Sequence, residues 1–289
     1  MKVIVTGATG YIGSHVCKLL AEHGHTVHGF DINLHGEYND VSAYCDTFTI
    51  QDITDKFIHG HADAIVHLAG RSVVPQSLKE PSEYYRVNTM GTRNLLQRMT
   101  SDNFIFAGTS SSWEMASPYA RSKVGAEDII KEKANGYTIF RFFNVSGTDG
   151  IHRQLGPASH LIRVAAMAAA KKIKALTIYG TDYDTRDGTC IRDYVHVLDL
   201  ANAIVKAVET GPMNTPYECL GSKQGWTVRE VIKTMKEVTG VNFDVLEGER
   251  RLGDSVANTV DTLSDYITLT KTIEDMCIDQ YKLEISRNS

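Results

Sequence analysis

The 289-residue sequence lacks the features that mark several large classes of protein. No apolar run in it approaches the roughly twenty residues that a membrane-spanning helix needs. The N-terminus passes straight from Met1 into a short strand-like stretch, without the apolar core and cleavage site of a secretory signal. Basic residues are not in excess, because 30 Lys and Arg stand against 35 Asp and Glu, a net charge of −5. We therefore expect a soluble, cytoplasmic protein with no nucleic-acid or membrane partner.

Closely spaced cysteines are missing as well, since the five cysteines are scattered and form no CxxC pair. An odd, dispersed set is typical of reduced thiols in a cytosolic protein rather than of a disulfide framework. The 11 histidines show no spacing typical of a metal site, so we expect no metal. What remains is an ordinary globular composition, 42% hydrophobic and 22% charged, with enough apolar residues for a large core.

Short β-branched runs alternate with amphipathic stretches through the first half of the chain. The pattern predicts strands at 2–6, 26–30, 47–50, 64–68, 104–107 and 137–143, and helices at 12–23 and 117–134. Such alternation predicts an α/β fold with a Rossmann-type, doubly wound parallel sheet. Later in the chain the pattern predicts helices at 159–170, 198–209 and 228–239, and strands at 176–179 and 217–220. We expect a Rossmann domain over 1–146, to which about 181–205 returns, and a smaller α/β substrate-binding lobe over 147–289.

Three glycines, Gly7, Gly10 and Gly13, lie between the first predicted strand and the first predicted helix. Glycines at such a junction allow a tight turn and a close approach of backbone to a pyrophosphate, to which the helix N-terminus offers N–H groups. Asp31 follows at the end of the second strand, where a carboxylate binds the adenosine ribose hydroxyls and repels a 2′-phosphate. The pattern predicts a site for NAD rather than NADP. The alternative is a glycine-rich turn that binds no ligand.

The Gly-x-x-Gly-x-x-Gly spacing resembles that of the extended short-chain dehydrogenase/reductase superfamily. Two later segments fit this resemblance: Asp52-Ile53, which in that superfamily faces the adenine, and residues 67–70, which lie near the pyrophosphate. Asn88 matches a family asparagine in the helix that follows. The resemblance implies that NAD contacts Gly7, Gly10, Tyr11, Ile12, Gly13, Asp31, Asp52, Ile53, Leu68, Ala69, Gly70, Asn88, Tyr119, Lys123 and Phe143.

Tyr119 and Lys123 are four residues apart in the predicted helix over 117–134 and therefore share one of its faces. A free phenol has a pKa of about 10, and a nearby cation stabilises its phenolate. The pair predicts a general base that removes a hydroxyl proton, although the same spacing is common on helix surfaces. The resemblance adds Thr109 as a third catalytic group. The neighbouring hydroxyls are the alternatives, and a hydroxyl-rich turn is another interpretation of the run Ser110, Ser111 and Ser112.

Three segments narrow the resemblance to the UDP-glucose/UDP-galactose 4-epimerase family: residues 141–147, 179–197 and 248–254. Arginines from two separate segments suit the pyrophosphate of a UDP-sugar. The resemblance implies that this substrate contacts Asn144, Leu161, Tyr179, Arg192, Arg251, Asp254 and Asn258. Without the motifs, Arg192-Asp193 is interpreted as a structural ion pair and Arg250-Arg251 as a solvated face. Asn258 stands where the family gates sugar size, and its small side chain predicts that N-acetylated hexoses are admitted.

The resemblance implies an NAD-dependent isomerase that epimerises UDP-glucose and UDP-galactose through a 4-keto intermediate. It also implies a homodimer, for which the stretches 82–99 and 122–134 are compatible interface helices. A dehydratase or decarboxylase of the same superfamily is an alternative, but Ser110-Ser111 stand where dehydratases have Asp-Glu. A non-catalytic NAD sensor is a second alternative, and it would need neither Tyr119 nor Lys123.

Overall fold

The computed structural model describes residues 1–32, 38–55, 59–251 and 253–287, and the chain divides into two compact units. Unit 1 comprises Met1–Phe142 and Ala201–Cys219, and unit 2 comprises Phe143–Leu200 and Leu220–Ser289. The chain therefore returns to unit 1 over 201–219 rather than about 181–205, and the first boundary follows residue 142 rather than 146. Leu252, inside the basic segment 248–254, lies outside the described residues.

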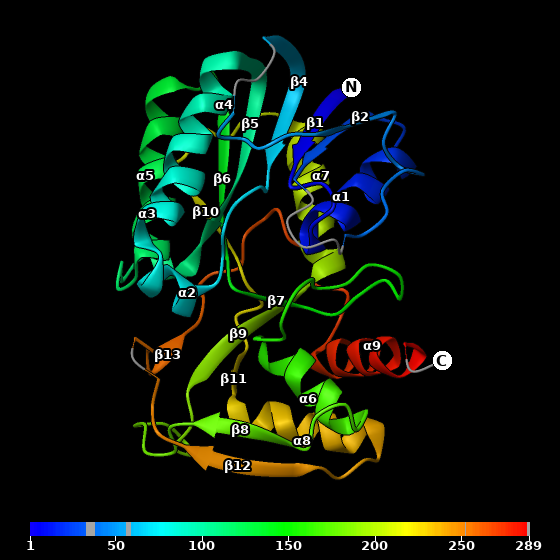
Figure 1. Cartoon of the computed structure of the whole chain (residues 1–289), viewed down its shortest axis with the longest axis vertical. Coiled ribbons are helices and arrows are strands. Elements are labelled where there is room, and N and C mark those ends of the chain that lie inside the picture. The colour runs from blue at the N-terminus through cyan, green and yellow to red at the C-terminus, as the bar shows by residue number, and fades with distance from the viewer. Residues whose placement is uncertain (33–37, 56–58, 252, 288–289) are drawn as a thin grey trace. The chain divides into compact units, whose positions relative to one another are not determined.

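Unit 1 is built on a seven-stranded sheet in the order β10-β6-β5-β4-β1-β2-β3 (Figure 1). Its strands are β1 (Lys2–Thr6), β2 (Thr26–Asp31), β3 (Thr47–Ile50), β4 (Gly60–His67), β5 (Met99–Thr109), β6 (Tyr137–Phe142) and β10 (Glu218–Leu220). All neighbours from β3 to β6 pair in parallel. The strand order reverses beside β1, which is the switch point where open α/β sheets bind ligands. The predicted Rossmann-type fold is confirmed.

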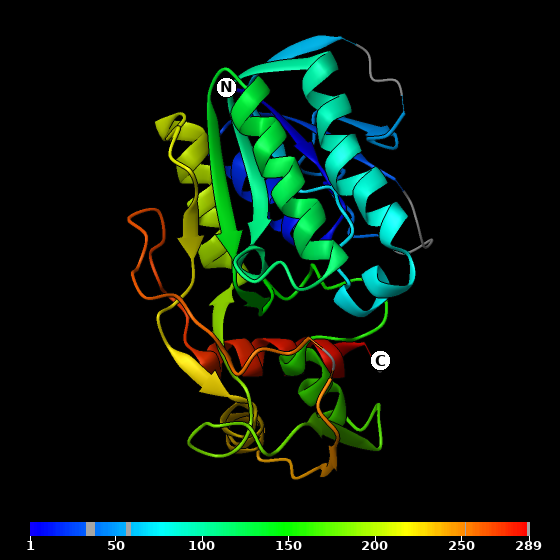
Figure 2. The same ribbon diagram turned by 90° about the vertical axis from the view of Figure 1, so that its left-hand side faces the viewer.

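Helices cover both faces of this sheet, as Figures 1 and 2 show. On one face lie α4 (Thr92–Arg98) and α5 (Pro118–Lys133); on the other lie α1 (Tyr11–Glu22) and the end of α7 (Val197–Thr210). The central strands are therefore buried on both sides and consist of continuous apolar runs. Val3, Ile65 and Phe104 are each at most 1% exposed.

The predicted helical stretch over 82–99 is not one continuous α-helix. It consists of α3 (Pro81–Tyr84), a π-helix η1 (Tyr85–Gly91) and α4, after which β5 begins; α2 (Val74–Lys79) precedes it. A π-helix holds its hydrogen bonds from i to i+5, and such wide turns occur frequently at functional sites. Asn88 lies in the middle of η1.

The start of α5 is fixed by two local signals. The Ser117 hydroxyl accepts a hydrogen bond from Ala120 N at 3.1 Å, and Pro118 occupies the first helical position. The short 3₁₀ helix η2 (Ser110–Ser112) directly follows β5. Tyr119 therefore lies in the first turn of α5, close in sequence to the carboxyl end of β5.

Unit 2 consists of small sheets and helices around a core of its own. Its strands are β7 (Asn144–Ser146), β8 (Ala175–Tyr179), β9 (Ile191–His196), β11 (Gly225–Thr227), β12 (Asp244–Gly248) and β13 (Ala257–Asn258). β9 pairs with β7, β11 and β13, and β8 pairs with β12. The helices α6 (Leu161–Ala169), α8 (Val228–Thr239) and α9 (Ile273–Ser286) enclose an apolar cluster that includes Ile162, Val231 and Cys277.

Helix α8 begins and ends at the residues that the sequence predicts. Thr227 and Glu230 form a capping box at its start, and Gly240 ends it with a left-handed backbone at φ +67°. α9 has a similar capping box at Thr272. Across the part of the chain that the structure describes, every helix is too short or too polar to cross a bilayer.

Candidate functional site

The glycine turn after β1 leaves no room for side chains. A Cβ at Gly13 would lie 2.0 Å from the Gly7 carbonyl oxygen, and one at Gly7, which has φ +72°, would lie 2.7 Å from Ala69 N. Among the described residues no side chain caps α1, whose N-cap is Gly10. The first N–H groups of a helix bind anions when no side chain takes them. The turn thus has the shape and polarity of a pyrophosphate site, and Tyr11 and Ile12 begin the helix that provides it.

Asp31 is fixed at the end of β2 by this same turn. Its Oδ2 accepts hydrogen bonds from Thr9 N at 2.8 Å and Thr9 Oγ1 at 2.7 Å, and its Oδ1 accepts one from Ile32 N at 2.7 Å. Each carboxylate oxygen can accept more than one bond. Asp31 therefore keeps acceptor capacity for ribose hydroxyls, beside the glycines with which the sequence associates it.

Asp52 and Ile53 both lie beside η1, but Asp52 makes polar contacts whereas Ile53 is buried in apolar packing. Asp52 Oδ1 accepts hydrogen bonds from Thr54 N and Oγ1 at 2.8 and 2.9 Å. The Ile53 side chain is 5% exposed and packs against Gly91, where a Cβ would lie 2.7 Å from Ile53 Cδ1. Ile53 is thus part of the packing between the loop and η1. Its contact with a cofactor stays a prediction.

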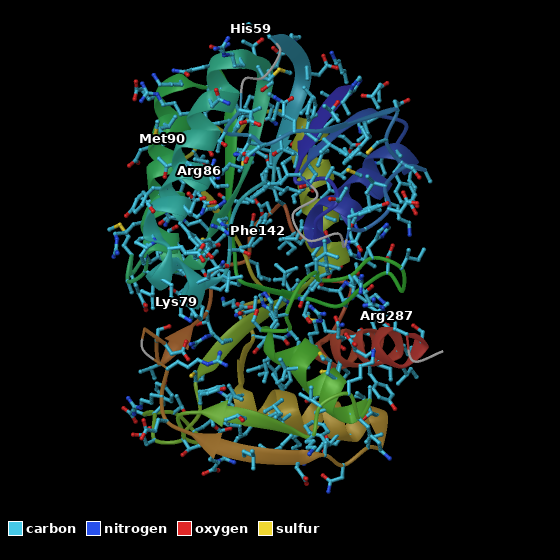
Figure 3. All side chains as sticks on the ribbon, viewed as in Figure 1. His59, Lys79, Arg86, Met90, Phe142 and Arg287 are labelled. Atoms are coloured by element: carbon cyan, nitrogen blue, oxygen red, sulfur yellow. The ribbon has the colours of Figure 1, made fainter. Side chains whose placement is uncertain are left out.

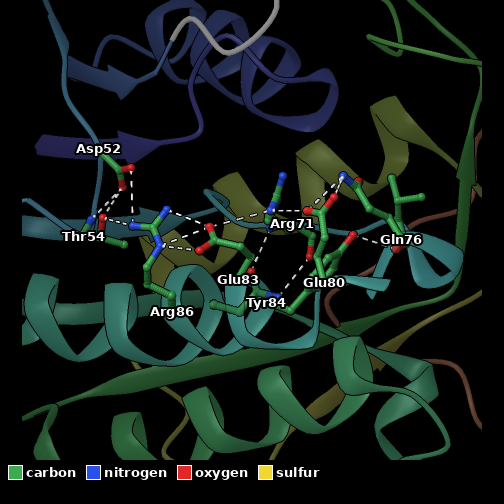
Figure 4. A network of polar contacts seen from close by, with 10 residues as sticks. Asp52, Thr54, Arg71, Gln76, Glu80, Glu83, Tyr84 and Arg86 are labelled. Atoms are coloured by element: carbon green, nitrogen blue, oxygen red, sulfur yellow. Dashed lines mark hydrogen bonds and ion pairs between the residues drawn. The ribbon is translucent and has the colours of Figure 1, made fainter. Parts of the chain in front are cut away.

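A network of charged side chains extends from Asp52 along α3 and η1, and Figure 4 shows it from close by. The Arg86 guanidinium lies 3.9 Å from Asp52 and donates to Glu83 Oε2 at 3.0 Å. Arg71 donates to Glu80 at 3.1 Å, and its guanidinium lies 5.6 Å from the centre of the Tyr84 ring. The Arg86 hydrogen bond lowers the pKa of Glu83, so this carboxylate is an anion at neutral pH. The sequence motifs did not indicate Arg71 or Arg86; repeated Arg and Glu at helical spacing was the available signal.

The segment after β4 is held by Asn88. Asn88 Oδ1 accepts a hydrogen bond from Arg71 N at 2.8 Å, and its Nδ2 donates to Arg71 O at 3.0 Å and to Ser122 Oγ at 2.9 Å. Leu68 N and Ala69 N donate to Thr6 at the end of β1. Gly70 is enclosed here, because a Cβ would lie 2.9 Å from Asn88 Oδ1 and 3.8 Å from Lys123 Nζ. Asn88 thus ties the segment beside Gly70 to α5.

Tyr119, Lys123 and Thr109 meet at the carboxyl edge of the sheet in unit 1. Lys123 Nζ lies 4.2 Å from the centre of the Phe106 ring in β5. Thr109, the last residue of β5, hydrogen-bonds to the Tyr119 phenol. The Tyr119 ring also meets the Tyr84 ring edge to face at 6.3 Å. The structure therefore places Thr109 next to Tyr119 and Lys123 one turn further along α5, and their joint catalytic role stays a prediction.

The titration of Tyr119 differs from the sequence-based expectation. Burial raises the pKa of this phenol, the Thr109 hydrogen bond opposes the rise, and Tyr84 adds to it, with a raised pKa as the result. Burial also lowers the pKa of Lys123 to about 8, against a smaller opposing effect of the Glu127 carboxylate. In the protein without ligand the phenol is not acidic, because removing phenolate from water outweighs the attractions within the protein. The expected acidic phenol includes the charge of a docked nicotinamide and stays a prediction.

Two residues expected to hold the nucleotide are stacked in unit 2. The Arg251 guanidinium lies 3.8 Å from the centre of the Tyr179 ring, at the end of β8. Tyr179 is 39% exposed. Arg250 points elsewhere: it pairs with Asp182 at 2.7 Å and covers the Tyr183 ring. The two adjacent arginines therefore contact different rings, and both are exposed, so the solvated-face interpretation stays open beside the predicted nucleotide site.

The other expected substrate residues of unit 2 gather around β9. Arg192 donates to Ser255 O at 2.9 Å and lies 3.8 Å from Asp254 Oδ1, while Asn258 pairs with it in β13. Asn144 Nδ2 donates to Asp193 O at 3.0 Å. Leu161 begins α6, and the mostly buried Phe143 lies 3.1 Å from the position of a Cβ on Gly221.

The Asp193 carboxylate forms no ion pair with Arg192 in the described part of unit 2. It accepts hydrogen bonds from Ser222, Lys223 and Val260, because successive residues of a strand point to opposite faces. No motif indicated this buried carboxylate, which joins β9 to two loops.

Metal binding is not decided by this arrangement. In the described residues of unit 1, ligand atoms of His61, Asp63 and Asp102 lie within 4.8 Å of one another, at the opposite end of β4 and β5. Asp63 already accepts a bond from Lys2 N at 2.6 Å, and the other two side chains are exposed. Exposed clusters of this kind are common without a metal, so the expected absence of one stays a prediction.

Comparisons with known proteins agree with one another. Residues 3–219 match the model of the NAD dependent epimerase/dehydratase family. The UDP-glucose 4-epimerase of Halalkalibacterium halodurans is 34% identical over an alignment of 290 positions that covers 88% of this chain and 85% of that protein. The UDP-glucose 4-epimerase from Brucella ovis in complex with NAD is 31% identical, with a TM-score of 0.85 and 98% of each chain covered. The UDP-Glc/GlcNAc 4-epimerase from Campylobacter jejuni is also 31% identical, with a TM-score of 0.76 and the same coverage.

Proposed function

The chain belongs to the NAD-dependent epimerase/dehydratase family, and on that premise we propose that it catalyses NAD-dependent 4-epimerisation of a UDP-hexose. The proposal is supported by the placement of Tyr119 and Lys123 one turn apart in α5, with Thr109 next to the phenol and Lys123 Nζ 3.8 Å from the position of a Cβ on Gly70. The similarity to UDP-glucose 4-epimerases over most of the chain supports the choice of reaction.

The residues of unit 1 fit NAD as the cofactor. The glycine turn excludes a Cβ at Gly7 and at Gly13, the α1 N-terminus suits a pyrophosphate, and Asp31 suits an unphosphorylated ribose. When bound, NAD supplies a hydride acceptor that can return the hydride to the opposite face of the sugar. Asp52, Gly70 and Lys123 are proposed to complete the set of cofactor contacts.

Side chains of the protein are proposed to transfer the proton of the sugar 4-hydroxyl. Tyr119 takes the proton of the sugar 4-hydroxyl and later returns it, and Thr109 donates a hydrogen bond to the same oxygen. Lys123, one helical turn from Tyr119, offers positive charge on that face of α5. The product of the first half-reaction is a 4-keto sugar, which must present its other face before reduction.

Unit 2 is proposed to hold the nucleotide rather than the hexose. Tyr179 offers a ring for the uracil, Arg192 and Arg251 offer cations for the pyrophosphate, and Asp254 offers an acceptor for the uridine ribose. Binding energy placed in the nucleotide leaves the hexose free to turn between the two half-reactions. Asn258 leaves space beside the sugar, so we propose that N-acetylated hexoses are also accepted, as the similarity to the Campylobacter jejuni protein supports.

A dehydratase is less well supported than an epimerase. Ser110 and Ser111 follow Thr109 at the places where dehydratases have Asp-Glu, so the turn supplies hydroxyl groups instead of an acid–base pair for the elimination of water. An NAD sensor would not need a phenol hydrogen-bonded to Thr109 beside a buried ammonium.

We also propose a cytoplasmic homodimer. The support lies in η1, which packs against α5 and has exposed apolar side chains, Tyr85 at 38% and Met90 at 50%. Arg86 and Met90 are labelled on this stretch in Figure 3. Apolar side chains on paired helices suit a helical interface between subunits, and sedimentation of the purified protein measures the state directly.

The base is tested with Tyr119→Phe. This variant should bind NAD and UDP-sugar as wild type does and lose at least about 100-fold in kcat, the usual contribution of a general base. Each protein is incubated with UDP-glucose, UDP-galactose and their N-acetyl forms, and the products are separated by chromatography. Tyr281→Phe in α9 removes a phenol from the other unit and should leave kcat unchanged. Near-normal turnover by Tyr119→Phe would exclude the phenol as the base.

A further inference from the structure

His67, the last residue of β4, stands at the centre of a buried hydrogen-bond chain in unit 1. Its side chain is 0% exposed and its ring packs against Phe104 and Phe106 with ring centres 5.7 and 5.6 Å away. Nδ1 lies 2.6 Å from Thr6 Oγ1, and Nε2 lies 2.9 Å from Thr92 Oγ1. Both ring nitrogens therefore have a hydroxyl partner.

The directions of these bonds follow from the neighbouring groups. Thr92 Oγ1 donates its only hydrogen to Asn88 O at 2.6 Å, because a carbonyl can only accept, so it must accept from His67 Nε2–H. Nδ1 is then an acceptor, and Thr6 donates to it while accepting from Ala69 N at 3.3 Å. One chain results, from Ala69 N–H through Thr6, His67 and Thr92 to the Asn88 carbonyl.

Only a neutral imidazole can donate with one nitrogen and accept with the other. Burial, with a further contribution from the Lys123 charge, lowers the pKa of His67 to about 3, which agrees with this state. His67 is therefore neutral near pH 7, and its two hydrogen bonds give it a structural place in the site.

The hydrogen-bond chain ends at Asn88, whose side chain contacts both the segment after β4 and α5. The Asn88 carbonyl receives the Thr92 bond, while the Asn88 amide holds Arg71 N, Arg71 O and Ser122 Oγ. Ser122 Oγ in turn donates to Tyr119 O at 2.8 Å. Asn88 lies in a π-helix, whose wide turn lacks the regular bonding of an α-helix and gains from an external support.

We propose that His67 is a positioning residue for the epimerase reaction: as the Nε2–H tautomer it fixes Asn88, and through Asn88 the segment 69–71 and the first turns of α5. This inference rests on the proposed function, since the geometry that it maintains is that of Tyr119 and Lys123. It differs from core packing alone, because an apolar filler could supply packing but not the bond to Thr92.

Two amide variants distinguish the hydrogen bond made by Nε2 from the one made by Nδ1. In His67→Gln the amide nitrogen reaches the place of Nε2 and can still donate to Thr92. In His67→Asn the amide ends near the place of Nδ1, so it can accept from Thr6 but leaves Thr92 without its donor. His28→Asn is the matched control, because His28 Nδ1 in β2 makes a 2.6 Å contact with Thr47 Oγ1 in β3, on an exposed pair.

We expect His67→Asn to lose about 10- to 100-fold in kcat, the effect of one unmet buried hydrogen bond transmitted to the reaction site. KM for the UDP-sugar should stay within about threefold, because unit 2 is proposed to hold the nucleotide. His67→Gln should recover most of the lost kcat, and His28→Asn should match wild type. Equal losses of thermal stability in both His67 variants with wild-type kcat would show a purely structural histidine and overturn the proposal.

A measurement without turnover keeps this inference separate from the proposed function. Long-range ¹⁵N–¹H correlation spectra of histidine-labelled protein identify His67 as the signal missing from His67→Gln. That signal should show the Nε2–H pattern at all values from about pH 5.5 to 8.5, because its pKa lies far below. An Nδ1–H pattern, or a His67 signal that titrates near pH 6.5, would contradict the hydrogen-bond chain through His67 and overturn the proposal. If the spectrum agrees but wild type turns over no UDP-sugar, the proposed function fails and only the hydrogen-bond chain stands.

Discussion

Lys123 offers a prediction in which stability and activity change in opposite directions. The residue is 6% exposed, and burial lowers its pKa from 10.5 to about 8. A change of this size corresponds to about 3 kcal/mol of destabilisation of the folded protein at pH 7. Lys123→Met removes the charge and keeps most of the stem, but it loses a cation–π contact with Phe106 of about 0.5–2 kcal/mol. We expect this variant to be about 1–3 kcal/mol more stable than wild type at pH 7, and inactive.

The stability difference between Lys123→Met and wild type should depend on pH. Between about pH 8 and 10.5 the unfolded chain still holds the Lys123 proton and the folded protein does not, so wild-type stability rises with pH. Below pH 8 both states are protonated and the full penalty applies. The advantage of Lys123→Met should therefore shrink by about 2 kcal/mol between pH 7 and pH 9.5.

Urea unfolding of cofactor-free protein, followed by circular dichroism at both pH values, measures this difference. Lys133→Met is the control, because Lys133 pairs with Glu132 at the exposed end of the same helix. Its effect should be about 0.5 kcal/mol or less at either pH. A Lys123→Met variant that is less stable than wild type at pH 7, or a difference that does not change with pH, would refute the reasoning.

Three further predictions concern unit 1. Asp31→Ala should weaken NAD binding about tenfold or more and raise the affinity for NADP relative to that for NAD, because the carboxylate that binds ribose hydroxyls and repels a phosphate is gone. Fluorescence titration with both cofactors measures the two affinities. Gly13→Ala should abolish NAD binding, because its Cβ would lie 2.0 Å from a carbonyl oxygen, and calorimetry should detect no heat of binding. Glu127→Gln should destabilise the protein by about 3–5 kcal/mol, because it leaves Arg141 buried without its carboxylate partner at 2.7 Å. The control, Glu247→Gln at an exposed ion pair, should change stability by at most about 1 kcal/mol. Thermal unfolding of both variants measures the difference.

Local sequence signals account for the elements that were predicted well. The strands of the first sheet are apolar runs because both faces are covered, and α8 has a capping box and a terminal glycine. The π-helix over 85–91 could not be predicted, since apolar spacing does not distinguish an i to i+5 turn within a longer helical stretch. β13 has two residues, and its conformation depends on pairing with β9 rather than on its own sequence.

The candidate site divides in the same way between local and tertiary information. The spacing of Tyr119 and Lys123 and the position of Thr109 at the end of an apolar strand are visible in the sequence, and the structure places Thr109 next to Tyr119. The direction of the Tyr119 pKa could not be predicted, because it depends on burial by residues distant in the chain. The role of His67 was hidden for a similar reason: its partners Thr6 and Thr92 lie 61 and 25 residues away.

The two perturbed pKa values explain why the base needs its cofactor. Burial raises the pKa of Tyr119 and lowers that of Lys123, so both groups are driven toward their neutral forms. A phenolate base beside an ammonium requires the opposite shifts. A cation next to the phenol would lower the first pKa, and an anion next to the amine would raise the second. A dinucleotide with a cationic ring and a diphosphate carries charges of both kinds and would counter these shifts if they lay beside the two groups. On the proposed function, we therefore expect Tyr119 to act as a base only when cofactor is bound, and to stay protonated in the cofactor-free protein.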